Sequence, residues 1–291
     1  MIFRDLRIDF RWFFVFLYFN KIKMQTVCKY NVIISFTTTF TSNYWAQNLR
    51  SGMLVRVIDP DGMDVLEINS QGIIVNRIKD ETQDTFYIVD EDADGNYRRI
   101  YKTDNNGNTI LDENGNPVFN SISFEYGTVE SQRTTALNST DSYDTYKVRG
   151  DDNGTQMFEF MSQNTNVEWS QAKTGVAGDK GLNFLTTSHD KKSEAGISNL
   201  YRGQLYAGYT IRELNHNHPG NTAYPSGSFD YTDDKGNFHP TGTWGDVGFS
   251  RSITNNRQTN RLNVPIFQIY LPGNKSYISY GSNSIISNYG R

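Results

Sequence analysis

Cysteine is almost absent from this sequence of 291 residues, in which Cys28 is the only one. A single cysteine excludes a disulfide framework and a cysteine-based zinc site within one chain. Long apolar runs are scarce as well. The run at residues 12–19 has eight apolar residues, whereas a membrane-spanning helix needs about 20. We therefore expect no stable membrane span.

An excess of positive charge is also missing. The chain has 28 Lys and Arg against 32 Asp and Glu, which gives a net charge of −4. Domains that bind nucleic acids usually carry a basic patch, so we expect no nucleic-acid partner. Hydrophobic residues make up only 36% of the chain, which has 24 Gly, 18 Tyr and 18 Phe. This composition predicts short strands joined by many turns.

The first 58 residues show no clear alternation and no capping signals, and we interpret them as a leader of uncertain order. Three arginines ahead of the apolar run imitate a secretory signal peptide. However, Asp5 and Asp9 interrupt the charged region, and no small-residue cleavage site follows at once. Residues 1–50 are either a native leader or the misassigned start of a longer reading frame, and no function is built on them.

Residues 59–147 predict a β-hairpin region followed by a linker. Asp59-Pro60-Asp61-Gly62 is strong turn chemistry. Strand-forming runs at 65–68, 72–78 and 85–89 alternate with Asp-Gly and Asn-Gly turns up to residue 130. The aspartates at 90–94 and 104–112 lack the spacing of an EF-hand loop, so we interpret them as turn residues. Residues 131–147 are rich in Ser, Thr and Asp, which favours a linker.

Residues 148–291 predict an α+β domain. We expect a helix at 151–161 and another after Asp246. Strands are expected at 166–170, 182–187, 204–212, 264–270 and 277–280, with a polar loop at 191–196. Helices that alternate with short strands in this way favour a mixed sheet flanked by helices.

Two of the four histidines lie in one short stretch, His216-Asn217-His218-Pro219. Residues i and i+2 of a strand point to the same face, so both imidazoles can reach one ion. Pro219 lacks an N–H and ends the strand. Two histidines and a downstream carboxylate would supply three ligands and leave a fourth position open, as in catalytic zinc sites. The alternative is a pair of solvated side chains.

This stretch resembles the JAB/MPN (JAMM) metallopeptidase motif, which reads Glu, then His-x-His-Pro, then Ser-x-x-Asp. The closer resemblance is to the JAB-like toxin domain at the C-terminus of Bacteroidetes Rhs-type polymorphic toxins, and it covers roughly residues 148–291. Asp59-Pro60-Asp61-Gly62 resembles the segment that closes the Rhs core in such toxins. The resemblance implies a JAB/MPN-like fold with a cytidine-deaminase-like layout, bound Zn²⁺ and peptidase activity.

Glu168 is the candidate general base, because it lies on an expected strand between Val167 and Trp169. The resemblance also implies a glutamate on a strand that precedes the histidines. Glu213 is three residues before His216 and should face away from both imidazoles. Glu194 lies in a polar loop, where we expect it to be solvated.

The Ser-x-x-Asp element departs from the family's pattern. Three residues after Ser226 comes Phe229, and Asp230 is one place late. The segment from Ser228 to Asp246 reads as an insertion, after which Thr243-x-x-Asp246 restores the spacing. We therefore expect His216, His218 and Asp246 to bind the metal, with Asp230 as the alternative third ligand.

Either of two hydroxyls, those of Ser226 and Thr243, could stabilise the oxyanion. The other two histidines carry weaker predictions. We expect His239 at the surface, and His189 is a weak candidate for a residue that supports a ligand.

The sequence thus predicts a zinc-dependent peptidase or isopeptidase that acts as the toxin domain of a larger protein. The resemblance implies secretion or delivery into a target cell, a cognate immunity protein, and a protein or peptide substrate, including ubiquitin-like proteins and peptide crosslinks. The alternatives are a metal-dependent nuclease toxin, which the negative net charge disfavours, and a catalytically inactive JAB-fold binding module.

Overall fold

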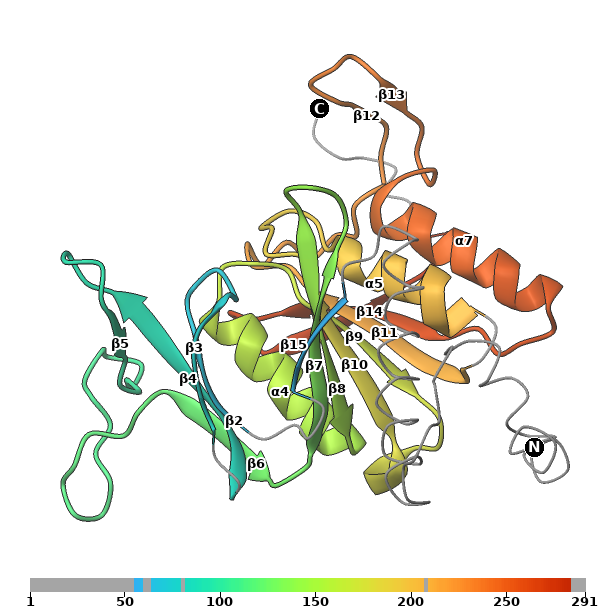
Figure 1. Ribbon diagram of the computed structural model, residues 1–291. Coiled ribbons are helices and arrows are strands. Elements are labelled where there is room, and N and C mark those ends of the chain that lie inside the picture. Colours follow the sequence, from blue (N-terminus) through green and yellow to red (C-terminus); the bar gives the residue numbers. More distant parts are fainter. Residues whose placement is uncertain (1–54, 60–63, 80–81, 207–208, 284–291) are drawn as a thin grey trace, which may run out of the picture. The chain divides into compact units, whose positions relative to one another are not determined.

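The computed structural model describes residues 55–59, 64–79, 82–206 and 209–283 (Figure 1). Contacts divide the chain into two compact units, one of residues 1–56 with 135–140 and the other of residues 57–134 with 141–291. The second unit contains the described helices and most residues of the described strands. Most of the expected leader and Pro60-Asp61-Gly62 lie outside the described residues.

An eight-stranded mixed sheet forms the centre of the second unit. Its order is β1-β7-β8-β10-β9-β11-β14-β15. The strands are β1 (Val55–Asp59), β7 (Val129–Ala136), β8 (Ser142–Arg149), β9 (Ser170–Thr174), β10 (Leu182–Thr187), β11 (Ile211–Asn217), β14 (Ile266–Leu271) and β15 (Ser276–Tyr280). The pair β11–β14 is parallel, whereas β9 pairs antiparallel with both β10 and β11. With its flanking helices, this sheet confirms the predicted α+β class.

Side chains alternate between the two faces of the sheet along each strand, and each face packs against different helices. One face packs against α5 (Ala195–Leu200), the π-helical segment η2 (Tyr201–Leu205) and α7 (Gly245–Thr259). Its buried side chains include Phe184, Leu214 and Phe267. The other face packs against α4 (Asp151–Asn164), and Figure 1 shows α4 and α7 on opposite sides of the sheet. Because the side-chain period of a strand is two, neighbouring residues serve different cores.

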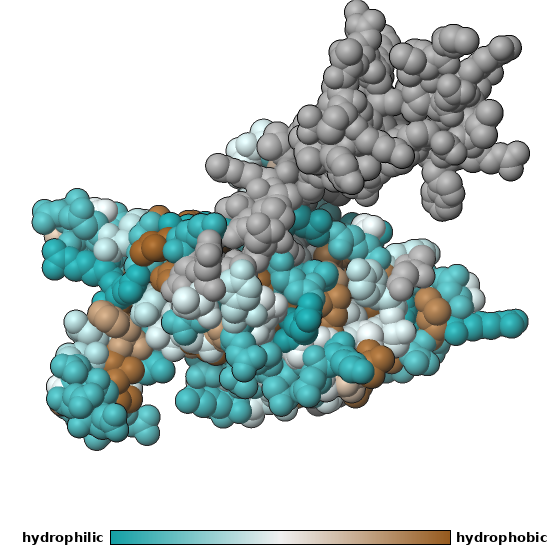
Figure 2. All heavy atoms as spheres, turned by 60° about the horizontal axis from the view of Figure 1, so that its bottom comes forward, coloured by the Kyte–Doolittle hydropathy of each residue, from teal (hydrophilic) through white to brown (hydrophobic). Residues whose placement is uncertain are grey.

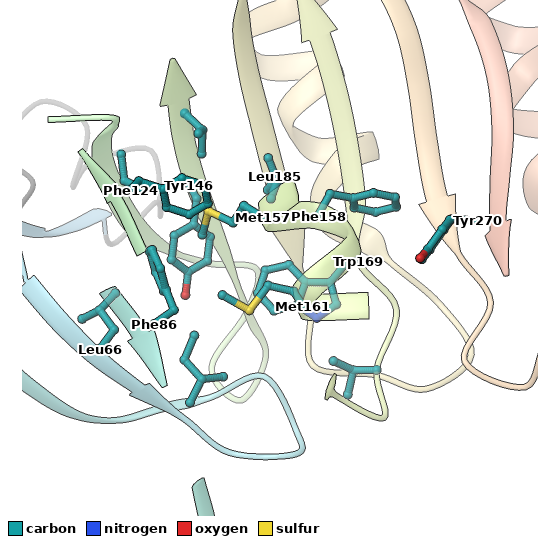
Figure 3. Close-up of a cluster of buried hydrophobic side chains, with 14 residues drawn as sticks. Leu66, Phe86, Phe124, Tyr146, Met157, Phe158, Met161, Trp169, Leu185 and Tyr270 are labelled. Atoms are coloured by element: carbon teal, nitrogen blue, oxygen red, sulfur yellow. The ribbon is translucent and has the colours of Figure 1, made fainter. Parts of the chain in front are cut away.

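The hairpin region contributes to the core beneath α4. It comprises β2 (Asp64–Ile68), β3 (Ile74–Lys79), β4 (Gln83–Glu91), β5 (Tyr97–Arg99) and β6 (Ser121–Glu125). Figure 3 shows Leu66, Phe86 and Phe124 from these strands in one buried cluster with Met161 and Trp169. The Phe86 and Phe124 rings meet edge to face, with centroids 6.3 Å apart. The hairpins and the main sheet therefore share apolar packing.

One turn sequence, Asp-x-x-Gly-Asn, recurs four times in the described residues. The turns begin at Asp92, Asp104, Asp112 and Asp233. In each, the aspartate Oδ1 accepts backbone N–H groups from the residues two and four places on. The glycine of each turn has φ between 82° and 84°. These carboxylates act within turns, as the sequence predicted for the three in the hairpin region.

The expected linker at 131–147 is wrong. Strand β7 begins at Val129, and β8 pairs with β10 from Asp144 to Arg149. Several polar residues of this segment are buried in the sheet. Asp144 is 5% exposed and accepts a 2.6 Å hydrogen bond from the Thr134 hydroxyl. The polar composition of residues 131–147 therefore led to a wrong prediction of a linker. The domain boundaries at 59 and 148 remain predictions.

Two strands and one loop also differ from expectation. The strand expected at 166–170 is β9, which begins only at Ser170, because the Glu168 N–H bonds to the Asp190 carbonyl outside the ladder. The strand expected at 204–212 begins at Ile211, after helical residues. The polar loop expected at 191–196 ends where α5 begins, at Ala195.

The surface matches the low hydrophobic content. On the face that Figure 2 shows, hydrophilic residues predominate and hydrophobic ones form small separate groups. Among the helices of the described residues, none is long and apolar enough to cross a membrane.

The close approach of α4 to the sheet generates a stability prediction. A Cβ added at Gly154 would lie 2.3 Å from Cγ of Asn183, whose side chain is buried and hydrogen-bonded. We expect Gly154→Ala to lower the free energy of unfolding by about 1–3 kcal/mol through overpacking. Gly203→Ala, with nothing within 4 Å of the added carbon, is the control. Urea unfolding of both variants tests this, and equal stability would contradict the described packing.

Candidate metal centre

Strand β11 sets the positions of the two histidines. His216 pairs with Ser170 of β9 on one side and with Ile269 of β14 on the other. The ladder ends at the next residues, where the His218 N–H donates to the Tyr270 carbonyl over 3.1 Å. Leu214 and His216 face the core of α5 and α7, and His218 follows the same alternation. The Nε2 atoms of the two histidines are 3.1 Å apart.

Asp246 comes from the first turn of α7, far along the chain from the histidines. Ser226 holds it by two reciprocal contacts: the Ser226 N–H donates to Asp246 Oδ2 over 2.7 Å, and the Asp246 N–H donates to the Ser226 Oγ over 2.9 Å. A Cβ at Gly227 would meet the Trp244 carbonyl at 2.0 Å, and one at Gly245 would meet the Ser226 Oγ at 2.3 Å. Glycine at both positions lets the two chain segments approach.

The residues between these segments form a small excursion. Strands β12 (Tyr231–Thr232) and β13 (Phe238–His239) pair as a hairpin, and the Gly242 N–H donates to the Gly227 carbonyl at its base. The predicted insertion therefore leaves and returns at nearly the same place. As a result, Ser226 and Asp246 are neighbours although they are 20 positions apart in the sequence.

The three candidate ligands form a compact triangle. Besides the 3.1 Å between the imidazoles, His216 Nε2 is 3.3 Å from Asp246 Oδ1, and His218 Nε2 is 3.5 Å from Asp246 Oδ2. An ion bound tetrahedrally at about 2.0–2.2 Å holds its ligand atoms about 3.3–3.6 Å apart. The group can therefore hold one ion with little movement, and two imidazoles with a carboxylate are a donor set that suits zinc.

The tautomer of His218 also suits a metal ligand. Its Nδ1 lies 2.7 Å from the Thr222 carbonyl oxygen, which can only accept a hydrogen bond. Nδ1 must therefore carry the proton, so in the neutral ring the lone pair is on Nε2. Such a hydrogen bond fixes the orientation of a ligand histidine and raises its basicity.

Hydrogen bonds and charges within the triangle together outweigh the effect of burial on its pKa values. Burial alone would raise the pKa of Asp246, but the charges and hydrogen bonds of His216 and His218 outweigh it and hold the pKa well below its usual range. Burial would lower the pKa of His218, but Asp246 outweighs it and raises the pKa. The carboxylate thus favours cations at the place where the imidazoles meet.

Glu168 lies close to this triangle. Burial raises the pKa of its carboxyl group to about 8, with His218 acting to lower the pKa and Asp246 to raise it. The Thr187 hydroxyl donates to the Glu168 backbone carbonyl over 2.9 Å. In the described part of the chain, no side-chain hydrogen bond engages the Glu168 carboxyl group. The carboxyl group therefore has no hydrogen-bonding role in holding the described fold together.

Asn217 fixes the segment that carries Glu168, and the sequence analysis missed it. Its side chain is fully buried on the opposite face of β11 from the imidazoles. Its Oδ1 accepts the Trp169 N–H over 2.5 Å, and its Nδ2 donates to the Val167 carbonyl over 3.3 Å. Both neighbours of Glu168 are thus tied to the residue between the two histidines. The signal was available, since the middle residue of His-x-His points to the other face of a strand.

The structure separates the other candidates from the triangle. Asp230 Oδ1 instead accepts the N–H and the hydroxyl of Thr241 within the excursion. Glu213 pairs with Lys173 over 2.8 Å, on the face away from the imidazoles, as expected. Glu194 is not solvated, because it caps α5 and accepts the N–H groups of Gly196 and Ile197.

The remaining polar candidates have partners of their own. The Ser226 hydroxyl is within 2.9 Å of Asp246 Oδ2, and the Thr243 hydroxyl donates to the Pro240 carbonyl over 2.6 Å. His189 lies 3.6 Å from Asp144 and contacts the Gln71 carbonyl rather than a metal ligand. His239 is half-buried in the excursion, 3.4 Å from Asp233.

The triangle opens into a cleft of about 690 Å³. Glu168, Ser226 and Thr243 line it together with the three candidate ligands, and it continues between η2 and α7. A cleft of this size accommodates a ligand larger than water or a simple anion.

Comparison with known proteins supports the resemblance noted from the sequence. Residues 146–247 match the family described as JAB-like toxin 1. The match covers about a third of the chain and includes Glu168, both histidines and Asp246. No curated protein and no solved structure matches the chain. The predicted JAB-like toxin domain is thereby confirmed for the matched residues.

The Asn217 contacts predict a local effect. We expect Asn217→Ala to speed amide hydrogen exchange at Trp169 and to lower the free energy of unfolding by about 1–3 kcal/mol, because buried groups lose their partners. Gln171→Ala is the matched control, since Gln171 is equally buried and also makes two side-chain hydrogen bonds, to Asn183 and Asn215. It should cost similar stability and leave Trp169 protected. A Trp169 amide that stays protected in Asn217→Ala would contradict the assignment.

Proposed function

We propose that this chain is a zinc-dependent peptidase or isopeptidase that acts as the toxin domain of a larger protein. The observation that carries the proposal is the triangle of His216, His218 and Asp246, with ligand atoms 3.1–3.5 Å apart beside a buried glutamate. The JAB-like toxin match supports the toxin role. Bound zinc would activate a water molecule and polarise the scissile carbonyl.

The chain's own residues divide the remaining work. His218 keeps its Nδ1 proton on the Thr222 carbonyl, which directs Nε2 to the ion. Glu168 is the group proposed to take a proton from the attacking water and to deliver it to the leaving nitrogen. A carboxyl group whose pKa lies near neutrality is suited to both transfers. The Asn217 side chain holds the backbone on both sides of Glu168, through its hydrogen bonds to Trp169 and Val167, and so keeps that carboxyl group in place.

The oxyanion donor is proposed to be Ser226 or Thr243. Both line the cleft, but each hydroxyl is engaged with a protein acceptor. Either side chain must rotate its O–H toward the substrate to stabilise developing charge. Ser226 has the additional task of holding Asp246 in place.

The setting that we propose is delivery into a target cell. The substrate is then a protein or peptide of that cell, and the producing cell needs an immunity protein to protect itself. A nuclease is disfavoured by the net charge of −4. A binding module without catalysis is the other alternative, and zinc content together with hydrolysis separates it from an enzyme.

Metal binding is the first test. We expect the full chain to bind one Zn²⁺, His216→Ala to lose it, and His239→Ala to keep it. Affinity should fall as pH is lowered, because protons bind His218 in the metal-free protein. The raised pKa of His218 makes this competition begin above the usual value of about 6.5. Atomic absorption and calorimetry at several pH values measure this, and zinc retained by His216→Ala would refute the assignment.

Growth of cells that express the full chain is the second test. We expect the wild type to arrest growth and Glu168→Gln to relieve the arrest while still binding zinc. The control is Glu213→Gln, which changes a glutamate that faces away from the site and pairs with Lys173. It should arrest growth like the wild type. Equal arrest by Glu168→Gln would show that the toxicity does not depend on this chemistry.

A further inference from the structure

The cleft follows one face of α7 away from the metal centre. Asp246, Phe249, Ile253 and Asn256 all line it, and their spacing of three, four and three residues places them on one side of the helix. At 1.5 Å per residue, this face runs for about 15 Å. An extended peptide spans about 3.3–3.6 Å per residue, so the face accommodates about four residues.

An aromatic wall stands one helical turn from the metal ligand. Phe249 of α7 and Tyr201 of η2 meet edge to face, with ring centroids 6.4 Å apart. Tyr201 is buried in one core cluster with Ile197 and Leu214, Phe249 packs against that cluster, and all four residues line the cleft. Three residues along a helix correspond to about 4.5 Å. A side chain next to the scissile amide could therefore rest against this wall.

The carboxylates that line the cleft have roles of their own, whereas the cations that line it have no ion-pair partner in the described part of the chain. Its three carboxylates are committed: Asp246 to the histidines, Glu194 to the N-terminus of α5, and Glu168 to the proposed proton transfer. Two exposed cations, Lys192 and Arg202, also line the cleft, and neither has an ion pair in the described part of the chain. Arg202 directly follows Tyr201 of the aromatic wall. The rim is therefore complementary to a negative charge beside an apolar group.

We propose that the cleft binds an extended acidic-apolar peptide segment. A large apolar side chain lies against Tyr201 and Phe249, next to the scissile amide, and a carboxylate one or two residues further along pairs with Arg202. The placement of the scissile amide rests on the proposed function. The binding preference itself does not require turnover.

The test uses the full chain with Glu168→Gln, immobilised and exposed to a synthetic library of end-blocked hexapeptides randomised at four positions. Bound peptides are identified by mass spectrometry. We expect Phe, Tyr, Leu or Ile followed within two positions by Asp or Glu. Adding Phe249→Ala should reduce the apolar enrichment about tenfold, and Phe249→Leu should keep an aliphatic preference. Adding Arg202→Glu should reduce the acidic enrichment about fivefold.

Lys180→Glu is the matched control for charge, because Lys180 is exposed and does not line the cleft. It should leave the enrichment unchanged. Thermal unfolding establishes that each variant is folded. The proposal is overturned if the library shows no enrichment, or if folded Phe249→Ala and Arg202→Glu select the same peptides as their parent. A chain that binds no zinc but selects these peptides would refute the proposed function and leave the cleft assignment standing.

Discussion

The two-faced alternation of β11 is the constraint on which the rest of this site depends. Leu214 and His216 serve one face of the strand, while Asn215 and Asn217 serve the other. The strand is hydrogen-bonded to β9 and β14, so a slip of one residue would exchange imidazoles for amides on both faces. The two candidate histidine ligands and the segment that carries Glu168 are thus aligned by a single register.

A chain of buried amides reinforces that register. Asn215 donates to Gln171 of β9 over 3.1 Å, and Gln171 donates to Asn183 of β10 over 3.0 Å. Asn183 in turn donates over 2.8 Å to the carbonyl of Gly150, where α4 begins. Each buried amide depends on the next for a partner, so a shift of any one strand would leave polar groups unpaired. Polar residues, rather than apolar ones, therefore fix the strands relative to one another and to α4.

The sequence predicted local features well and tertiary context poorly. The spacing of His216 and His218 and the helix after Asp246 were readable, because strand and helix periods are local properties. Residues 131–147 were predicted to be a linker, because nothing in a Ser/Thr/Asp-rich segment reveals that neighbouring strands will pair with it. Glu194 was misjudged for the same reason: its carboxylate is held by the first turn of a short helix that no periodic pattern announced. The alternation of the strand predicts that Asn217 points away from the imidazoles. Its role could not be predicted, because it depends on which segment lies against the other face of β11.

The excursion between Ser226 and Asp246 shows how a spaced motif survives an insertion. The entropy of closing a loop grows only with the logarithm of its length, so added residues cost little if the ends still meet. Here the ends meet through the reciprocal bonds of Ser226 and Asp246 and through glycines that permit backbone contact. The added residues fold on themselves as a hairpin with its own Asp-x-x-Gly-Asn turn. In this chain the contact between Ser226 and Asp246 therefore holds the two residues together in space, although they are far apart in the sequence.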